Sequence, residues 1–247
     1  MSQGNLPSMN RNAPITNLFE TPVKSGPGFE TQSGKVYRFL RDRILSGAYK
    51  PGDRLVRRTL GKQFDTSPIA VAEALWKLES DGLVESEAMH GSRVKTFTLE
   101  QVRGELLLRE ALETEVARLC AKRHELLPIE HLRSQAEKID KIMSVPRDEY
   151  NREDMEVHCN FHRELARHCD AEPIARELER IWFQHIMVFN WINSAIFPVP
   201  ADWHQRLVQA IASGDPDHAD AMMRKHIEFG CDHQENVLRR INEDISK

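Results

Sequence analysis

The feature that most constrains this fold is a tight turn, Asp65-Thr66-Ser67, between two stretches with helical apolar spacing. Ser67 suits a helix N-cap and Pro68 the first helical position, so a helix is expected from there to about Asp81, next to the terminating Gly82. A shorter helix is expected before the turn, over residues 57–64. Two helices joined by a tight turn are typical of the helix-turn-helix that reads DNA.

The flanking segments extend this unit. One helix is predicted upstream, because Val36, Leu40 and Ile44 recur every four residues. A β-hairpin is predicted downstream, where apolar residues bracket the polar His90-Gly91. The pattern therefore predicts a winged helix-turn-helix over residues 33–96, with the hairpin as the wing. Residues 1–32 are rich in Asn, Pro, Gly, Ser and Thr and are expected to form a disordered tail.

The remainder of the chain is expected to be helical. Prolines and glycines separate six segments with helical apolar spacing. Their approximate spans are 99–125, 128–143, 148–169, 173–196, 201–213 and 216–245. Six helices of this length can bury a core of their own, so we expect an antiparallel all-helical bundle over residues 99–245. The predicted fold class is mainly α, with a small β-hairpin wing.

Charge and compartment signals agree with this division. Residues 33–95 hold 12 Lys and Arg against 8 Asp and Glu, whereas the chain beyond them holds 20 against 28. A basic module beside an acidic one suits a nucleic-acid reader joined to another domain. No apolar run reaches the roughly 18 residues of a membrane helix, the N-terminus lacks a signal-peptide core, and the four cysteines are scattered. We expect a cytoplasmic protein with no membrane partner.

Four histidines are predicted to face the interior of the helical bundle. His158 and His162 are four residues apart on one helix, and His204 and His226 lie on the apolar stripes of two others. Four buried imidazoles favour a divalent transition metal such as Zn, Ni, Co or Fe, with Zn first, over Mg or Ca. The alternative is a set of core histidines bonded to the backbone or to one another.

A metal-dependent enzyme on a helical bundle is the rival class. The His158-x-x-x-His162 spacing occurs in zinc proteases, but their general base is a Glu directly after the first His, and here that residue is Cys159. The sequence also lacks a P-loop, a G-x-G-x-x-G run and a G-x-S-x-G run. The chain is therefore not expected to be an enzyme.

Several segments together resemble one regulator family. The runs LRDRILSGAYKPGDRL, SPIAVAEALWKLESDGLVE and HGSRV resemble the winged helix of GntR-family regulators. The runs FHRELA, HQRLVQAIASGDPDHA and RKHIEFG resemble the FCD ligand-binding domain of the FadR subfamily. The resemblance covers about residues 33–245. It implies a homodimer, usually a repressor, on a roughly palindromic double-stranded DNA operator.

The resemblance also implies a small organic acid as effector, and in some members a metal. His162, His204 and His226 match the family's metal ligands, whereas His158 stands where the family has Asp. An Arg in the first helix of the domain can hold the effector carboxylate, which suits Arg109. An ion pair with Glu113 is the alternative for Arg109, and a metal-free sensor is the alternative for the domain. His185 and Asn190 are further effector candidates, with core packing as the alternative for His185.

The predicted DNA contacts surround the turn and the wing. Cations, helix N-termini and a wing tip without a side chain suit contacts with phosphate or a groove. The candidates are Arg57, Arg58, Lys62, Thr66, Ser67, Ile69, His90, Gly91 and Arg93, with solvated surface residues as the alternative. The family places Arg at the positions of Pro68 and Ala72. Because this helix cannot make those Arg–guanine contacts, thymine methyls, the wing or DNA shape are expected to carry more of the specificity.

Overall fold

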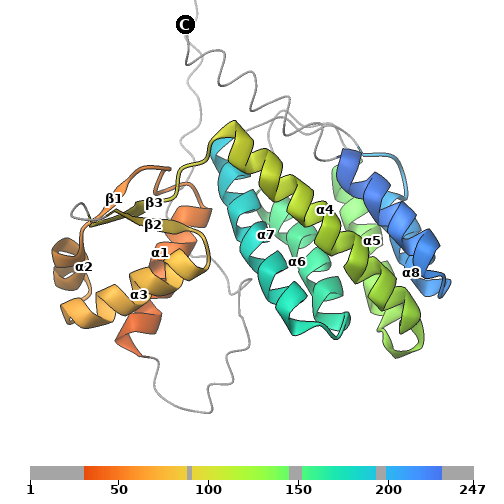
Figure 1. The fold of residues 1–247 in the computed structure, drawn as a ribbon, viewed down its shortest axis with the longest axis horizontal. Helices are drawn as coiled ribbons and strands as arrows, with labels where there is room; N and C mark the ends of the chain where they lie inside the picture. The colour runs from red at the N-terminus through yellow and green to blue at the C-terminus, as the bar shows by residue number, and fades with distance from the viewer. Residues whose placement is uncertain (1–30, 88–90, 145–151, 193–198, 230–247) are drawn as a thin grey trace, which may run out of the picture.

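The computed structural model describes residues 31–87, 91–144, 152–192 and 199–229. The predicted tail, apart from its last two residues, and the wing residue His90 lie outside this part of the chain. Within it, an N-terminal domain with a small sheet stands beside a bundle of helices (Figure 1). No helix among the described residues is long and apolar enough to cross a lipid bilayer.

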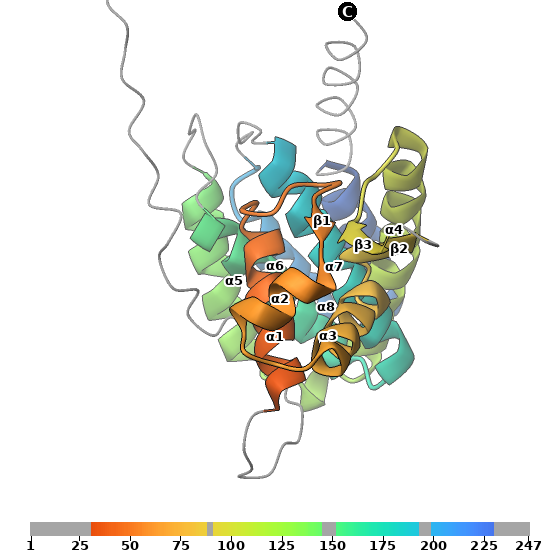
Figure 2. The same cartoon turned by 90° about the vertical axis from the view of Figure 1, so that its left-hand side faces the viewer.

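The N-terminal domain is a winged helix-turn-helix, as predicted. Its elements are α1 (Gln32–Leu45), β1 (Arg54–Leu55), α2 (Arg57–Gln63), α3 (Pro68–Ser80), β2 (Val84–Glu87) and β3 (Gly91–Val94). The sheet is antiparallel in the order β1-β3-β2, so β1 adds a third strand to the expected hairpin. Figure 2 looks onto this domain, with the bundle behind it.

Local chemistry explains where α3 begins. The Ser67 hydroxyl accepts a hydrogen bond from the Ala70 N–H at 3.2 Å, and Pro68 occupies the first turn. Asp65 adopts a left-handed φ of 46°, which tightens the turn between α2 and α3. The inner faces of α1 and α3 form the core of the domain. Its buried side chains include Val36, Leu40, Ile44, Val71, Leu75 and Leu78.

The C-terminal domain is a bundle of six helices, as predicted. They are α4 (Leu99–Lys122), α5 (Ile129–Met143), α6 (Arg152–His168), α7 (Glu172–Ile192), α8 (Trp203–Ala212) and a helix over residues 216–229, with a short 3-10 turn, η1 (His124–Leu126), after α4. A capping box between Thr98 and Gln101 fixes the start of α4 directly after the wing. Most buried apolar side chains of the two domains belong to one continuous cluster, and Val102 and Val188 form a second one.

Helix α7 is the bundle helix that packs against the winged domain, where it contacts α1. Gly82, at the end of α3, leaves space for the side chain of Gln184. In the amide orientation that satisfies its neighbours, Gln184 donates to Glu105 at 3.1 Å and accepts from Lys95 at 3.2 Å and from Arg180 at 2.6 Å. Polar contacts therefore join the wing, α4 and α7 at the domain junction.

Candidate metal centre and DNA-binding face

The bundle brings together the four histidines selected by their helical phase. His158 and His162 come from α6, His204 from α8 and His226 from the helix over 216–229. One ring nitrogen of each lies within 4.8 Å of those of the other three. The Nε2 atom of His162 is 3.1 Å from that of His158 and 3.2 Å from that of His226. The cluster could therefore hold a metal ion.

Burial favours the neutral form of three of these imidazoles. His162, His204 and His226 are almost fully buried, and His158 is partly buried. Burial, and then the neighbouring imidazoles, hold the pKa values of His158 and His226 well below 6.5. Burial also lowers the pKa of His204, against the opposing effect of Asp140. A neutral imidazole has one free lone pair, which is the form that binds a metal.

Two carboxylates orient two of the rings. Asp140 on α5 lies 2.7 Å from Nδ1 of His204 and also accepts from the His204 backbone N–H at 2.9 Å. Glu113 on α4 lies 2.8 Å from Nδ1 of His162. A proton on Nδ1 of His204 leaves its Nε2 lone pair directed at the cluster, which is how outer carboxylates commonly support metal-bound histidines. Asp140 was not predicted from the sequence, although its position on the buried stripe of α5 was a usable signal.

The donor set fits a transition metal, and so do two of its spacings, while the widest pair of nitrogens, up to 4.8 Å apart, would have to draw closer around one ion. Ligands about 2.1 Å from zinc are about 3.0 Å apart at 90° and about 3.4 Å apart in a tetrahedron, which brackets the two Nε2 separations of 3.1 and 3.2 Å. Hydrogen bonds between histidines would account for those two contacts. They would leave the buried Nε2 of His204 without a partner among the described residues. A cation would satisfy all four nitrogens.

Arg109 connects this cluster to a neighbouring pocket. Its Nε donates to Glu113 at 2.8 Å, and its guanidinium lies 4.1 Å from the centre of the Trp182 ring. The ion pair with Glu113, which was the alternative to an effector contact for Arg109, is thus present. Although burial raises the pKa of Glu113, Arg109 and His162 together hold it down to about 2, so the carboxylate stays charged.

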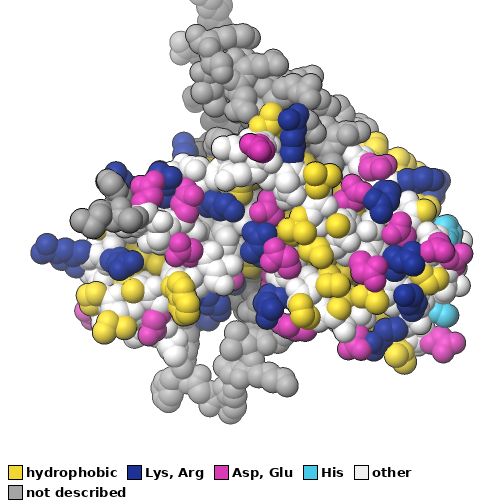
Figure 3. All heavy atoms as spheres, viewed as in Figure 1, with side chains coloured by type: hydrophobic (Ala, Val, Ile, Leu, Met, Phe, Trp, Pro, Cys, Tyr) yellow, Lys and Arg dark blue, Asp and Glu magenta, His cyan; other side chains and the backbone are white. Residues whose placement is uncertain are grey.

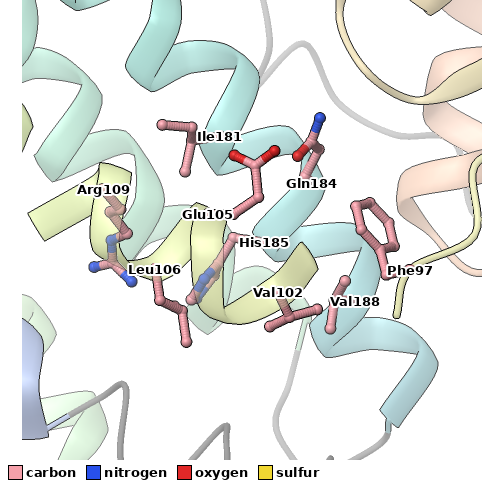
Figure 4. A pocket seen from close by; sticks show the side chains of 9 residues that line it. All are labelled: Phe97, Val102, Glu105, Leu106, Arg109, Ile181, Gln184, His185 and Val188. Atoms are coloured by element: carbon pink, nitrogen blue, oxygen red, sulfur yellow. The ribbon is translucent and has the colours of Figure 1, made fainter. Parts of the chain in front are cut away.

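The pocket lies between α4, α7 and the linker from the wing (Figure 4). Its walls are mostly apolar, and they include two predicted effector residues, Arg109 and His185. The full lining is Phe97, Val102, Glu105, Leu106, Arg109, Ile181, Gln184, His185 and Val188. Asn190, the third predicted effector residue, lies on α7, but its side chain is outside the described residues.

The predicted DNA-binding residues lie around α2, α3 and the wing. Arg57, Arg58 and Lys62 are exposed on α2. Ser67 and Ile69 are exposed at the start of α3, and Thr66 is partly buried in the turn before it. At the wing, Gly91 is exposed with φ 88°, and Arg93 is paired with Glu85 at 2.8 Å and Glu87 at 2.6 Å.

A second large apolar side chain exposed on α3, Trp76, was not predicted from the sequence. Trp76 is 76% exposed and Ile69 is 72% exposed. The signal was available, because Trp76 follows Ile69 by seven residues and therefore shares its helical face, away from the stripe of Val71, Leu75 and Leu78.

Comparisons with known proteins agree with both domains. The model of the FCD domain matches residues 106–229, half of the chain, and that of the bacterial regulatory proteins of the gntR family matches residues 32–94. The HTH-type transcriptional repressor RspR of Escherichia coli K12 is 24% identical over 205 residues, 78% of this chain and 85% of RspR. The transcriptional regulator YdhC of Bacillus subtilis is 22% identical over 210 residues, 84% of this chain and 93% of YdhC.

The fold is also found in solved structures. McbR/YncC of E. coli is similar with a TM-score of 0.64 and 17% identity, covering 84% of this chain and 99% of that one. A GntR transcriptional regulator from Rhodococcus sp. RHA1 has a TM-score of 0.62 and 22% identity, covering 84% of this chain and 97% of that one. The curated relatives named above are transcriptional regulators and not enzymes.

Proposed function

Because the chain belongs to the GntR family of bacterial regulatory proteins and carries an FCD domain, we propose that it is a metal-assisted repressor whose operator affinity responds to a small organic acid. It is a DNA-binding transcriptional regulator. Repression is supported by two relatives that are repressors, RspR and GlaR of E. coli. The observation that carries the sensor part of the proposal is the buried four-histidine cluster inside the FCD domain.

The proposed sensor site joins the cluster to the neighbouring pocket. His158, His162, His204 and His226 would hold a divalent transition metal, with zinc as the first candidate. Bound there, the ion would offer a carboxylate a Lewis-acidic partner with open coordination positions. Arg109 and His185, which line the pocket beside the cluster, and Asn190 on α7 would contact the rest of the acid. Arg109 supplies positive charge close to the carboxylate.

The proposed DNA contacts follow the exposed cations and helix ends of the winged domain. Arg57, Arg58 and Lys62 would contact phosphates, and Thr66 and Ser67 would approach the backbone at the start of α3. Ile69 would reach base edges in the major groove. Gly91, with His90 and Arg93, would bring the wing to the neighbouring groove.

A palindromic operator requires two copies of the protein, and we propose that the second copy docks on the outer face of α4. Leu107 is 69% exposed and Leu108 39% exposed on this face, and Gly104 and Ala111 beside them are exposed too. Figure 3 shows hydrophobic side chains gathered over this part of the bundle. A two-fold dimer would bury this patch and place two winged domains on one duplex.

Two measurements on purified, untagged protein test the proposal. Elemental analysis should find close to one transition metal per chain, and chelation should remove it. An operator duplex, selected from a random library by the loaded protein, should change affinity when citrate, malate or lactate is added at saturation. A chain that takes up no metal on reloading would overturn the metal part. Operator affinity that no bound carboxylate alters would overturn the sensor mechanism, because an effector and DNA that are linked must change each other's affinity.

A further inference from the structure

The outer face of α3 carries two large apolar side chains in an unusual position. Ile69 and Trp76 are 72% and 76% exposed, and they are two helical turns apart on one face. The opposite face of α3 is buried against α1. The exposed pair therefore contributes almost nothing to the core of the domain. Prominent exposed apolar side chains commonly mark a surface that meets a partner.

Charge on the same domain indicates which partner this is. Arg57, Arg58 and Lys62 are exposed on α2, which precedes α3 across the tight turn. Between Pro68 and Trp76, α3 itself holds no Lys or Arg. Cations flanking an apolar helix face suit a duplex, whose phosphates border a groove that contains uncharged base edges. The apolar face and the cationic helix together fit DNA.

We propose that Ile69 and Trp76 read thymine methyl groups in the major groove of each half-site. This inference rests on the proposed binding of an operator by the winged domain. The C5-methyl of thymine is the apolar group among the base edges of that groove, and apolar side chains contact it. The absence of Arg and Lys from this part of α3 removes the usual guanine contacts, so the methyl groups supply the sequence information at these positions.

The spacing of the two side chains fixes the spacing of the two thymines. Seven residues of α-helix rise about 10 Å. Base pairs are stacked about 3.4 Å apart. A helix lying along the groove, which runs obliquely to the duplex axis, would therefore place Ile69 and Trp76 over thymines about two to three base pairs apart, with the same pair repeated in the symmetry-related half-site.

Deoxyuridine substitution tests the proposal, because it removes the methyl group and keeps the base pair. The probe is the duplex that the wild-type protein selects from a random library, labelled for fluorescence anisotropy. Each thymine is replaced in turn by deoxyuridine in one half-site. Two positions about two to three base pairs apart should each weaken binding about fourfold, which is the value of one buried methyl group.

Two variants assign each methyl group to its side chain. In Ile69→Ala, deoxyuridine at one of the two positions should no longer weaken binding. In Trp76→Ala, deoxyuridine at the other position should no longer weaken it. Leu126→Ala is the matched control, because Leu126 is 73% exposed in the bundle and should leave both effects intact. All three side chains are exposed, so thermal unfolding should stay close to that of the wild type.

The remaining outcomes separate this inference from the function on which it rests. The thymine proposal would be overturned if no deoxyuridine weakened binding of the selected duplex. It would also be overturned if both variants still lost affinity at both deoxyuridine positions. Either result would leave operator binding intact. A Trp76→Ala variant with wild-type methyl effects and a changed sedimentation coefficient would assign the face to a protein contact instead. Failure of the wild-type protein to select any duplex would overturn operator binding itself, and this proposal with it.

Discussion

At the scale of single residues, the histidine cluster depends on the two carboxylates behind it. Asp140 holds Nδ1 of His204, and Glu113 holds that of His162. Asp140 favours the His204 tautomer that leaves Nε2 free for a metal, and both carboxylates would place a negative charge close to a bound ion. The cluster therefore includes more than its four rings.

Asp140→Asn tests this support. The amide removes the charge and can present the wrong atom to His204, so metal affinity should fall about 10- to 100-fold. Competition with a chromophoric chelator measures the change. Glu137→Gln, on the exposed face of the same helix, is the control and should bind metal as the wild type does. Equal affinities for both variants would show that Asp140 does not support the ligand.

His226→Ala tests the ligand set directly. Losing one of four nitrogen donors should sharply lower the metal content found by elemental analysis, while helix content by circular dichroism stays near that of the wild type. His218→Ala lies on the same helix at an exposed position and should retain full metal content. Full occupancy in His226→Ala would mean that the ligands are wrongly assigned.

The lowered pKa values of His158 and His226 predict how the metal-stripped protein responds to acid. Since these pKa values lie well below 6.5 in the folded chain, the unfolded chain binds protons first as pH falls. The free energy of unfolding should therefore decrease as pH drops below about 6.5. Urea titrations of the chelated protein between pH 8 and pH 5.5 would measure this, and His226→Ala should reduce the dependence. Stability that is flat across this interval would contradict neutral, buried rings.

At the scale of elements, local signals predicted most of the fold. The N-cap at Ser67, the apolar stripes and the proline boundaries located the helices and the hairpin. The strand β1 was missed because two residues, Arg54 and Leu55, have no periodicity; it exists because β3 offers an edge to pair with. Helical phase predicted that the four histidines point inward. It could not reveal that Asp140 faces His204, because the two residues are 64 positions apart in the sequence and lie on different helices.

The junction of α3 with α7 gives an element-scale prediction. Gly82 has φ 71°, and a Cβ there would clash with the terminal amide group of Gln184, which could swing away only by breaking its contacts with Lys95, Arg180 and Glu105. Gly82→Ala should therefore cost more stability than left-handed strain alone, which is about 1–2 kcal/mol. Gly91→Ala is the control, with φ 88° and open space around it.

Chemical denaturation of both glycine variants measures this difference. In a Gln184→Ala background the obstructing amide is gone, so the cost of Gly82→Ala should fall to that of Gly91→Ala. An equal cost for the two variants in the wild-type background would show that Gln184 does not restrain the end of α3.

At the scale of the whole molecule, the apolar face of α4 is the proposed surface for the second copy. Leu107→Lys with Leu108→Lys would place two charges in that interface, so the proposed dimer should dissociate to monomers in analytical ultracentrifugation. Operator affinity should fall with it, because each half-site would be bound separately. Leu126→Lys is the exposed control and should remain dimeric. A dimer that persists in the double variant would place the interface elsewhere.

The position of α7 bears on how far a signal must travel inside one chain. Trp182, under the Arg109 guanidinium and 4.9 Å from the His162 ring centre, is two residues from Gln184, which lies at Gly82. Two helical residues are about 200° apart around the axis, so the histidine cluster and the junction with the winged domain lie on opposite sides of one helix about 10 Å thick. Signalling between the proposed sensor site and the winged domain would therefore need no relay, because a shift or rotation of α7 would move both sides of the helix at once.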